Sequence, residues 1–193
     1  MLAVAQARGG GPDFVLADAG GAAIPGMPFD AAFSRFGVMF FEDPRASFAH
    51  LRSALQPGAP IVFICWRSLP ENAWASEPMS AAIPYLRELP ERPVPGAPGP
   101  FAFADRAHVT AVLTGAGFAD VSVTAFVTPY VMGATVEAAV DMSVRIGPLS
   151  RLIREQELEV EPIRRSLGET LRPFLTEDGV KMKAACWIVR ATA

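Results

Sequence analysis

The sequence is poor in cysteine and histidine, and this shortage excludes several classes of site. It has two cysteines and two histidines among 193 residues, and no two of them have the close spacing that structural zinc sites use. Cys65 and Cys186 each lie inside an apolar stretch, which predicts two buried, reduced thiols rather than a disulfide. His50 and His108 fall within predicted helices, and each is expected to have a surface or helix-packing role, with a catalytic base as the alternative. No metal site is therefore expected.

Positive charge and long apolar runs are also scarce. The net charge is −3, and lysine occurs only at positions 181 and 183, so nothing indicates a nucleic-acid partner. No apolar run approaches the roughly 18 residues that span a membrane, and the first ten residues lack the basic start of a signal peptide. These absences predict a cytoplasmic protein without a membrane span. The apolar fraction of 51% is ample for a core.

The order of apolar runs and turn signals predicts an α/β fold. Asp43 and Pro44 form a helix-start signal, and the unbroken apolar run 59–66 is typical of a central parallel strand. Strand, helix and strand at this spacing make a βαβ unit. The expected strands are 13–19, 29–36, 59–66, 118–127 and 179–193, and the expected helices are 44–55, 73–89, 105–114, 135–145, 148–156 and 161–175.

The chain is expected to form one domain, residues 1–193, with two unusually apolar insertions. These are residues 67–104 and 131–178. Segment 90–100 carries five prolines and two glycines and is predicted to be a loop. Apolar excursions from an α/β sheet commonly cover a ligand pocket. We therefore expect these two insertions to form a substrate-side cap.

The polar break after the second predicted strand marks the expected site. In open α/β sheets ligands bind at the carboxyl ends of the strands, which here carry Ser34, Arg35 and Phe36. Four aromatic residues are candidates for lining a pocket for an apolar or aromatic small molecule, and plain core packing is the alternative for each. They are Trp66, Trp74, Phe101 and Phe103.

Five stretches together resemble class I S-adenosylmethionine-dependent methyltransferases, of the branch that includes ubiquinone/menaquinone-type C-methyltransferases. They follow that family's order from its third strand to its seventh: FVLADA, FDAAFSRFGVMFF, LQPGAPIVFICW, GAGFADVSV and KMKAACWIV. The resemblance implies an incomplete Rossmann-like sheet with parallel strands, helices on both faces and a C-terminal antiparallel hairpin. The chain would be the C-terminal part of a methyltransferase domain.

The resemblance also implies a cofactor and residues to hold it. S-adenosyl-L-methionine would be the methyl donor, with Asp18 and Ala19 reading its adenine and Ser34, Arg35 and Phe36 bordering cofactor and acceptor. Asp18 could instead simply cap a turn. The acceptor would be a small apolar or aromatic molecule, and no catalytic residue can be assigned.

Two of the family's features are absent from the sequence. The Gly-rich loop after the first strand and the acid after the second have no counterpart, because Gly9–Gly11 follows a helix and precedes a strand. We therefore expect a truncated methyltransferase with weakened or lost cofactor binding, or a non-catalytic binding or assembly module. The predicted strand 13–19 could pair directly with 29–36, leave a gap for a second copy or partner chain, or be disordered.

Overall fold

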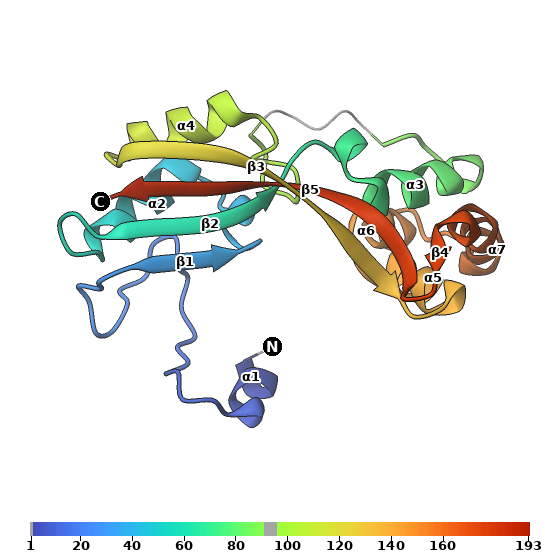
Figure 1. The fold of residues 1–193 in the computed structure, drawn as a ribbon, viewed down its shortest axis with the longest axis horizontal. Coiled ribbons are helices and arrows are strands. Elements are labelled where there is room, and N and C mark those ends of the chain that lie inside the picture. The colour runs from blue at the N-terminus through green and yellow to red at the C-terminus, as the bar shows by residue number, and fades with distance from the viewer. Residues whose placement is uncertain (1, 91–95) are drawn as a thin grey trace.

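A computed structural model describes residues 2–90 and 96–193. The strands β1 (Ala32–Arg35), β2 (Pro60–Trp66), β5 (Gly179–Thr192) and β3 (Ala119–Gly133) lie side by side in that order, and β4 (Leu175–Thr176) pairs with β5 (Figure 1). β1 and β2 are parallel, whereas β5 runs antiparallel to β2, β3 and β4. The predicted α/β fold and its C-terminal antiparallel hairpin are confirmed.

Aspartate caps begin two of the helices. Asp43 accepts a hydrogen bond from Ala46 N at 2.9 Å, and Asp105 accepts one from Ala107 N at 2.8 Å. The α-helices are α1 (Leu2–Arg8), α2 (Pro44–Ser53), α3 (Ala73–Ala82), α4 (Arg106–Gly115), α5 (Val136–Arg145), α6 (Pro148–Glu155) and α7 (Val160–Leu171). Short 3₁₀ turns occupy Val38–Phe40, Leu69–Glu71, Ile83–Tyr85 and Arg172–Phe174. No helix in the described parts of the chain is long and apolar enough to cross a membrane.

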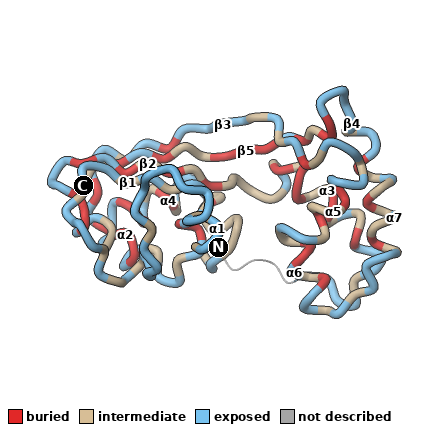
Figure 2. The backbone as a smooth tube through the Cα atoms, turned by 90° about the horizontal axis from the view of Figure 1, so that it is seen from below, coloured by how far each residue is buried: buried red, intermediate tan, exposed pale blue. Residues whose placement is uncertain are grey.

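Helices cover both faces of the sheet, but at opposite ends. On β5 the odd-numbered Val189 and Ala191 pack with α2 and α4 in a first core, and the even-numbered Met182 and Ala184 pack with α3, α5, α6 and α7 in a second. Alternate residues of a strand face opposite ways. β3 and β5 cross in Figure 1, so the twist of the sheet turns both helical groups toward the same side of the molecule (Figure 2).

The predicted strand 13–19 is wrong. These residues have no regular structure, and Val15 and Leu16 are 49% and 86% exposed. β1 pairs with β2 alone, so within the described residues segment 13–19 has no strand beside it. A strand must exchange hydrogen bonds with a neighbour to be stable, and its sequence pattern alone does not supply that neighbour.

Two element boundaries differ most from prediction. The helix expected over 73–89 ends at Ala82 and continues as a 3₁₀ turn, Ile83–Tyr85, because Pro84 cannot donate in the helix and its ring disfavours helical geometry before it. The strand expected to end near Val127 runs on to Gly133 as β3. Part of the predicted loop 90–100 lies outside the described residues.

Candidate functional site at the carboxyl ends of β1 and β2

The end of β1 forms the first part of the site. Phe36 N donates to Ile64 O at 3.1 Å, so the pairing with β2 continues one residue past the strand. Phe36 has a φ of 59°, a left-handed conformation that costs roughly 1–3 kcal/mol for a bulky residue and often occurs at functional sites. Its ring stacks on Trp66, with centroids 4.1 Å apart and planes at 13°. Ser34 is half-buried and Arg35 is exposed.

Four aromatic residues gather at this edge, and we call them the aromatic cluster: Phe36, Trp66, Trp74 and Tyr130. Trp66 lies 4.8 Å from Trp74 and 6.4 Å from Tyr130, measured between ring centroids, and Trp74 lies 5.7 Å from Tyr130. Burial raises the pKa of the Tyr130 hydroxyl. Phe36 and Trp66 come from the strand ends, whereas Trp74 begins α3 and Tyr130 lies on β3. The cluster therefore joins the sheet to the second core.

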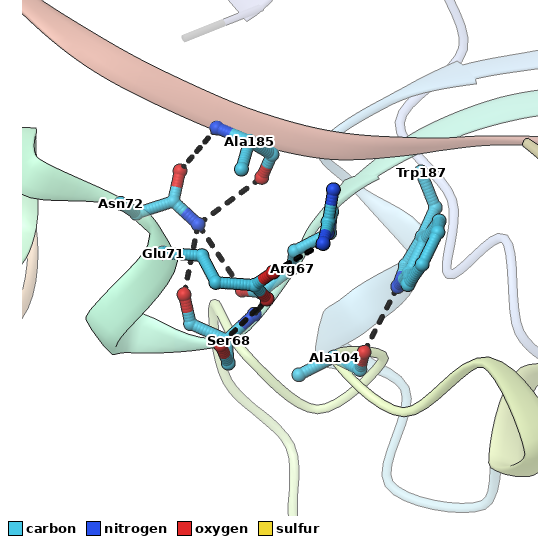
Figure 3. A network of polar contacts seen from close by, with 7 residues as sticks. All are labelled: Arg67, Ser68, Glu71, Asn72, Ala104, Ala185 and Trp187. Atoms are coloured by element: carbon cyan, nitrogen blue, oxygen red, sulfur yellow. Dashed lines mark hydrogen bonds and ion pairs between the residues drawn. The ribbon is translucent and has the colours of Figure 1, made fainter. Parts of the chain in front are cut away.

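A polar network fixes the end of β2 beside this cluster (Figure 3). The Arg67 guanidinium lies 4.6 Å from the centroid of the Trp187 ring and pairs with Glu71. Ser68 Oγ donates to Glu71 at 2.7 Å, and this bond, with smaller contributions from the Ser68 backbone and Arg67, lowers the pKa of Glu71. Trp187 Nε1 donates to Ala104 O at 2.9 Å. These contacts hold the β2 end against β5.

Asn72 is the buried centre of that network. Its Nδ2 donates to the carbonyls of Arg67, Ser68 and Ala185 at 3.2, 3.0 and 3.1 Å. Its Oδ1 accepts from Ala185 N at 2.8 Å and from Trp74 Nε1 at 3.1 Å. One side chain thus ties β2, β5 and the first turn of α3 together, and it fixes how the indole of Trp74 is oriented.

The turn that carries Asp18 lies near the start of α2. A Cβ placed on Gly20 would be 2.7 Å from Ser47 Oγ and 3.3 Å from the Phe41 ring, so this turn packs close to α2. At the end of α2, Ala54 O accepts a hydrogen bond from Phe29 N at 2.9 Å, and Phe29 lies just before β1. α2 is therefore antiparallel to β1, and Asp18 lies toward the carboxyl end of β1, as Ser34 does.

The carboxylate of Asp18 does not have the arrangement that the resemblance implies for reading adenine. Its Oδ1 accepts from Gly20 N at 2.9 Å, which caps its own turn, and neither Asp18 nor Ala19 ends a strand. Asp18 and Ala19 therefore stay predicted adenine contacts, held in a turn instead of at a strand end. Ser34, Arg35 and Phe36 remain predicted cofactor neighbours.

The aromatic pocket candidates fall into two groups. Trp66, Trp74 and Phe101 pack against the second core, whereas Phe103 is 1% exposed in the first core, with ring centroids 6.0 Å from Phe48 and 6.1 Å from Phe63. Beside Trp74 lies a small apolar cavity of about 10 Å³, bounded by α3, β3, α5 and α6. That volume holds about one water, so no larger ligand fits in this cavity.

Tyr130 is the member of the aromatic cluster that the sequence analysis did not identify. The predicted strand stopped near Val127, yet Thr128, Tyr130 and Met132 continue the alternation along β3. Extending that alternation could have placed Tyr130 on the second core. Within residues 2–90 and 96–193, no group of three or more His, Cys, Asp or Glu side chains could hold a metal ion.

The comparisons with known proteins concern the fold. No protein-family model and no curated protein match the sequence. A candidate methyltransferase from Bacillus halodurans C-125 aligns with a TM-score of 0.52 at 13% identity, over 93% of this chain and 76% of its own. A protein from work on the conversion of a disulfide bond into a thioacetal group during echinomycin biosynthesis aligns with a TM-score of 0.52 at 16% identity, over 98% of this chain and 59% of its own.

These likenesses establish that this chain shares the Rossmann-like fold of the two proteins. At such low identities they establish the fold alone. The chain spans about three quarters of the length of the first protein and under two thirds of the second.

Proposed function

We propose that this chain is an S-adenosylmethionine-dependent methyltransferase of the ubiquinone/menaquinone C-methyltransferase-like branch, with impaired activity. The observation that carries the proposal is the aromatic cluster at the carboxyl ends of β1 and β2, the edge at which α/β sheets bind ligands. The methyltransferase fold supports the reaction class.

The acceptor is a small apolar or aromatic molecule. The surfaces that meet at the site are aromatic rings, and the neighbouring cavity adds Met132, Met142 and Ile146. Aromatic rings and flexible methionines favour planar or apolar ligands over charged ones. The acceptor would enter between α3 and α6, where the cavity is now too small to hold it.

Cofactor binding is expected to be weak. The sequence has no Gly-rich loop after a first strand, and Asp18 caps its own turn. What remains to hold the cofactor is the end of β1, residues Ser34, Arg35 and Phe36. The proposed impairment therefore concerns the cofactor and leaves the acceptor side intact.

Titration calorimetry with S-adenosylhomocysteine tests the proposal. We expect binding in the millimolar range, about −4 kcal/mol, and we expect Phe36→Ala to abolish it because the stack on Trp66 is lost. Glu177→Gln changes an exposed acid in the β4–β5 turn and serves as the control that keeps wild-type binding. Absence of heat at millimolar ligand would reject cofactor use by this chain.

A second measurement separates catalysis from binding. The chain is incubated with S-adenosylmethionine labelled in the methyl group and a panel of small apolar and aromatic acceptors. Slow transfer of label to at least one acceptor, lost in Trp66→Ala, is the expected result. Binding heat without any transfer would favour the second candidate function, a non-catalytic binding or assembly module.

One observation favours that second candidate. The face of the sheet opposite α2 and α4 is uncovered near β1, where Phe33 is 75% exposed, and on β3, where Phe126 is 40% exposed. Exposed apolar surface of this kind is typical of interaction sites. Size-exclusion chromatography with light scattering discriminates, because a stable monomer without ligand would count against an assembly role.

A further inference from the structure

β1 has an open edge. It lies at the end of the sheet and exchanges hydrogen bonds with β2 alone, so its other side presents unpaired N–H and C=O groups. Phe33 and Arg35 point to the same face of this strand, and both are exposed. An open edge with an exposed aromatic side chain is a template for pairing with another strand.

The same chain also carries a segment without backbone partners. We call residues 2–17 the N-terminal arm; it leaves the body beyond β1, with α1 clear of the sheet (Figure 1). Val15 and Leu16 are 49% and 86% exposed. Residues 12–17 make no hydrogen bond with any other described residue. The arm thus has the apolar side chains and the free backbone of a strand that lacks its neighbour.

We propose that the N-terminal arm of one copy pairs antiparallel with the open edge of β1 in a second copy, and that the exchange is reciprocal. With Val15 opposite Phe33, Asp13 falls opposite Arg35 on the same face. This register places an apolar pair and an opposite-charge pair side by side, and cross-strand pairs of both kinds stabilise a sheet. It also gives the β1 edge hydrogen-bond partners.

The position at which the arm joins the body favours pairing with a second copy over antiparallel pairing with the chain's own β1. Gly20 packs by Ser47 and Phe41, so Asp18 lies toward the carboxyl end of β1. Antiparallel pairing with the chain's own β1 in this register would place residue 18 opposite residue 30, at the amino end of that strand. The charge pair therefore requires the β1 of another molecule.

Charge reversal tests the pairing through the oligomeric state. By light scattering we expect wild type to be a dimer at micromolar concentration. Asp13→Arg and Arg35→Asp should each weaken the dimer about tenfold or more, and the double variant should restore it. Glu177→Arg, an acid remote from β1 on the β4–β5 turn, is the control. A wild-type monomer, or a double variant no better than the single ones, would overturn the proposal.

Cysteine cross-linking tests the register. Val15→Cys with Phe33→Cys should give a disulfide-linked dimer on non-reducing gels, because opposite residues of an antiparallel pair are close. The native Cys65 and Cys186 are buried and should not compete. Val15→Cys with Ser34→Cys, which face opposite sides, is the control and should not link. A fast-migrating monomer would mean that the disulfide forms within one chain. That result would show that the arm pairs with β1 of its own chain and would overturn the proposal.

This inference does not depend on methyl transfer. The dimer could form in a catalytically dead chain, and label transfer could be observed in a monomer. The two proposals therefore fail separately.

Discussion

Asn72 is the side chain on which the site depends most. It is fully buried and satisfies Ala185 N and Trp74 Nε1 at once. A buried donor without a partner costs about 1–3 kcal/mol, and Asn72→Ala would leave two. We therefore expect this variant to lower the free energy of unfolding by about 3 kcal/mol, measured by urea denaturation, and to shift the fluorescence of Trp74.

Gln156 offers a matched control for this variant. Its side chain also bonds to backbone, accepting from Arg87 N at 2.9 Å and donating to Glu88 O at 2.8 Å, but these contacts are exposed. Water can replace them, so Gln156→Ala should cost less than about 1 kcal/mol. Equal losses in the two variants would contradict the role assigned to burial.

The cysteines should be unreactive in the folded protein. Burial raises the pKa of Cys65 to about 12 and that of Cys186 to about 11, and the thiolate is the reactive form. At pH 8 neither should react with a thiol reagent until denaturant is added, when both should. The raised pKa values mean that the folded protein holds these protons more tightly than the unfolded chain does. The two thiols therefore contribute their full stability below the ordinary cysteine pKa of 9.0, and this contribution declines as pH rises above it. Rapid labelling of the native protein would be the contrary result.

At the scale of elements, the contact of β3 with α5 leaves no room for a side chain. A Cβ on Gly133 would lie 2.6 Å from Ala139 N and 2.8 Å from Ala138 C, both backbone atoms. Gly133→Ala must push α5 away from β3, and we expect a loss of about 1–3 kcal/mol in the free energy of unfolding.

A glycine-to-alanine substitution within α7 should instead raise the free energy of unfolding. Gly168 lies inside Val160–Leu171, and a Cβ there would meet nothing within 4 Å. Gly168→Ala should raise the free energy of unfolding by up to about 1 kcal/mol, since alanine restricts the unfolded chain and favours the helix. Thermal unfolding of both variants measures the contrast, and a destabilised Gly168→Ala would contradict it.

The elements that local signals control could be predicted from sequence. α2 and α4 begin at the aspartates and end near the glycine turns from which they were expected, because capping and breaking act within a few residues. Segment 13–19 failed because a strand depends on a neighbour that no local pattern reveals. Tyr130 was missed because the predicted strand stopped at Val127, whereas pairing with β5 extends β3 to Gly133.

At the scale of the whole molecule, the fold was predictable from the order of the elements, but the assembly of the site was not. Ser34, Arg35, Phe36 and Trp66 lie at strand ends, as the sequence indicated. The meeting of Trp66 with Trp74 and Tyr130 depends on the twist that carries β3 and β5 from the first core to the second. That twist is a property of the complete sheet.

Strands β3 and β5 contribute to both hydrophobic cores, and this limits which parts of the protein can unfold locally. Residues Cys186–Val189 of β5 are paired with β2 on one side and with β3 on the other. Neither core can separate from the rest without disturbing this stretch. In a deuterium-exchange experiment its amides should therefore be the last to exchange, at a rate set by global unfolding, while those of residues 13–17 should exchange within the dead time in any free monomer.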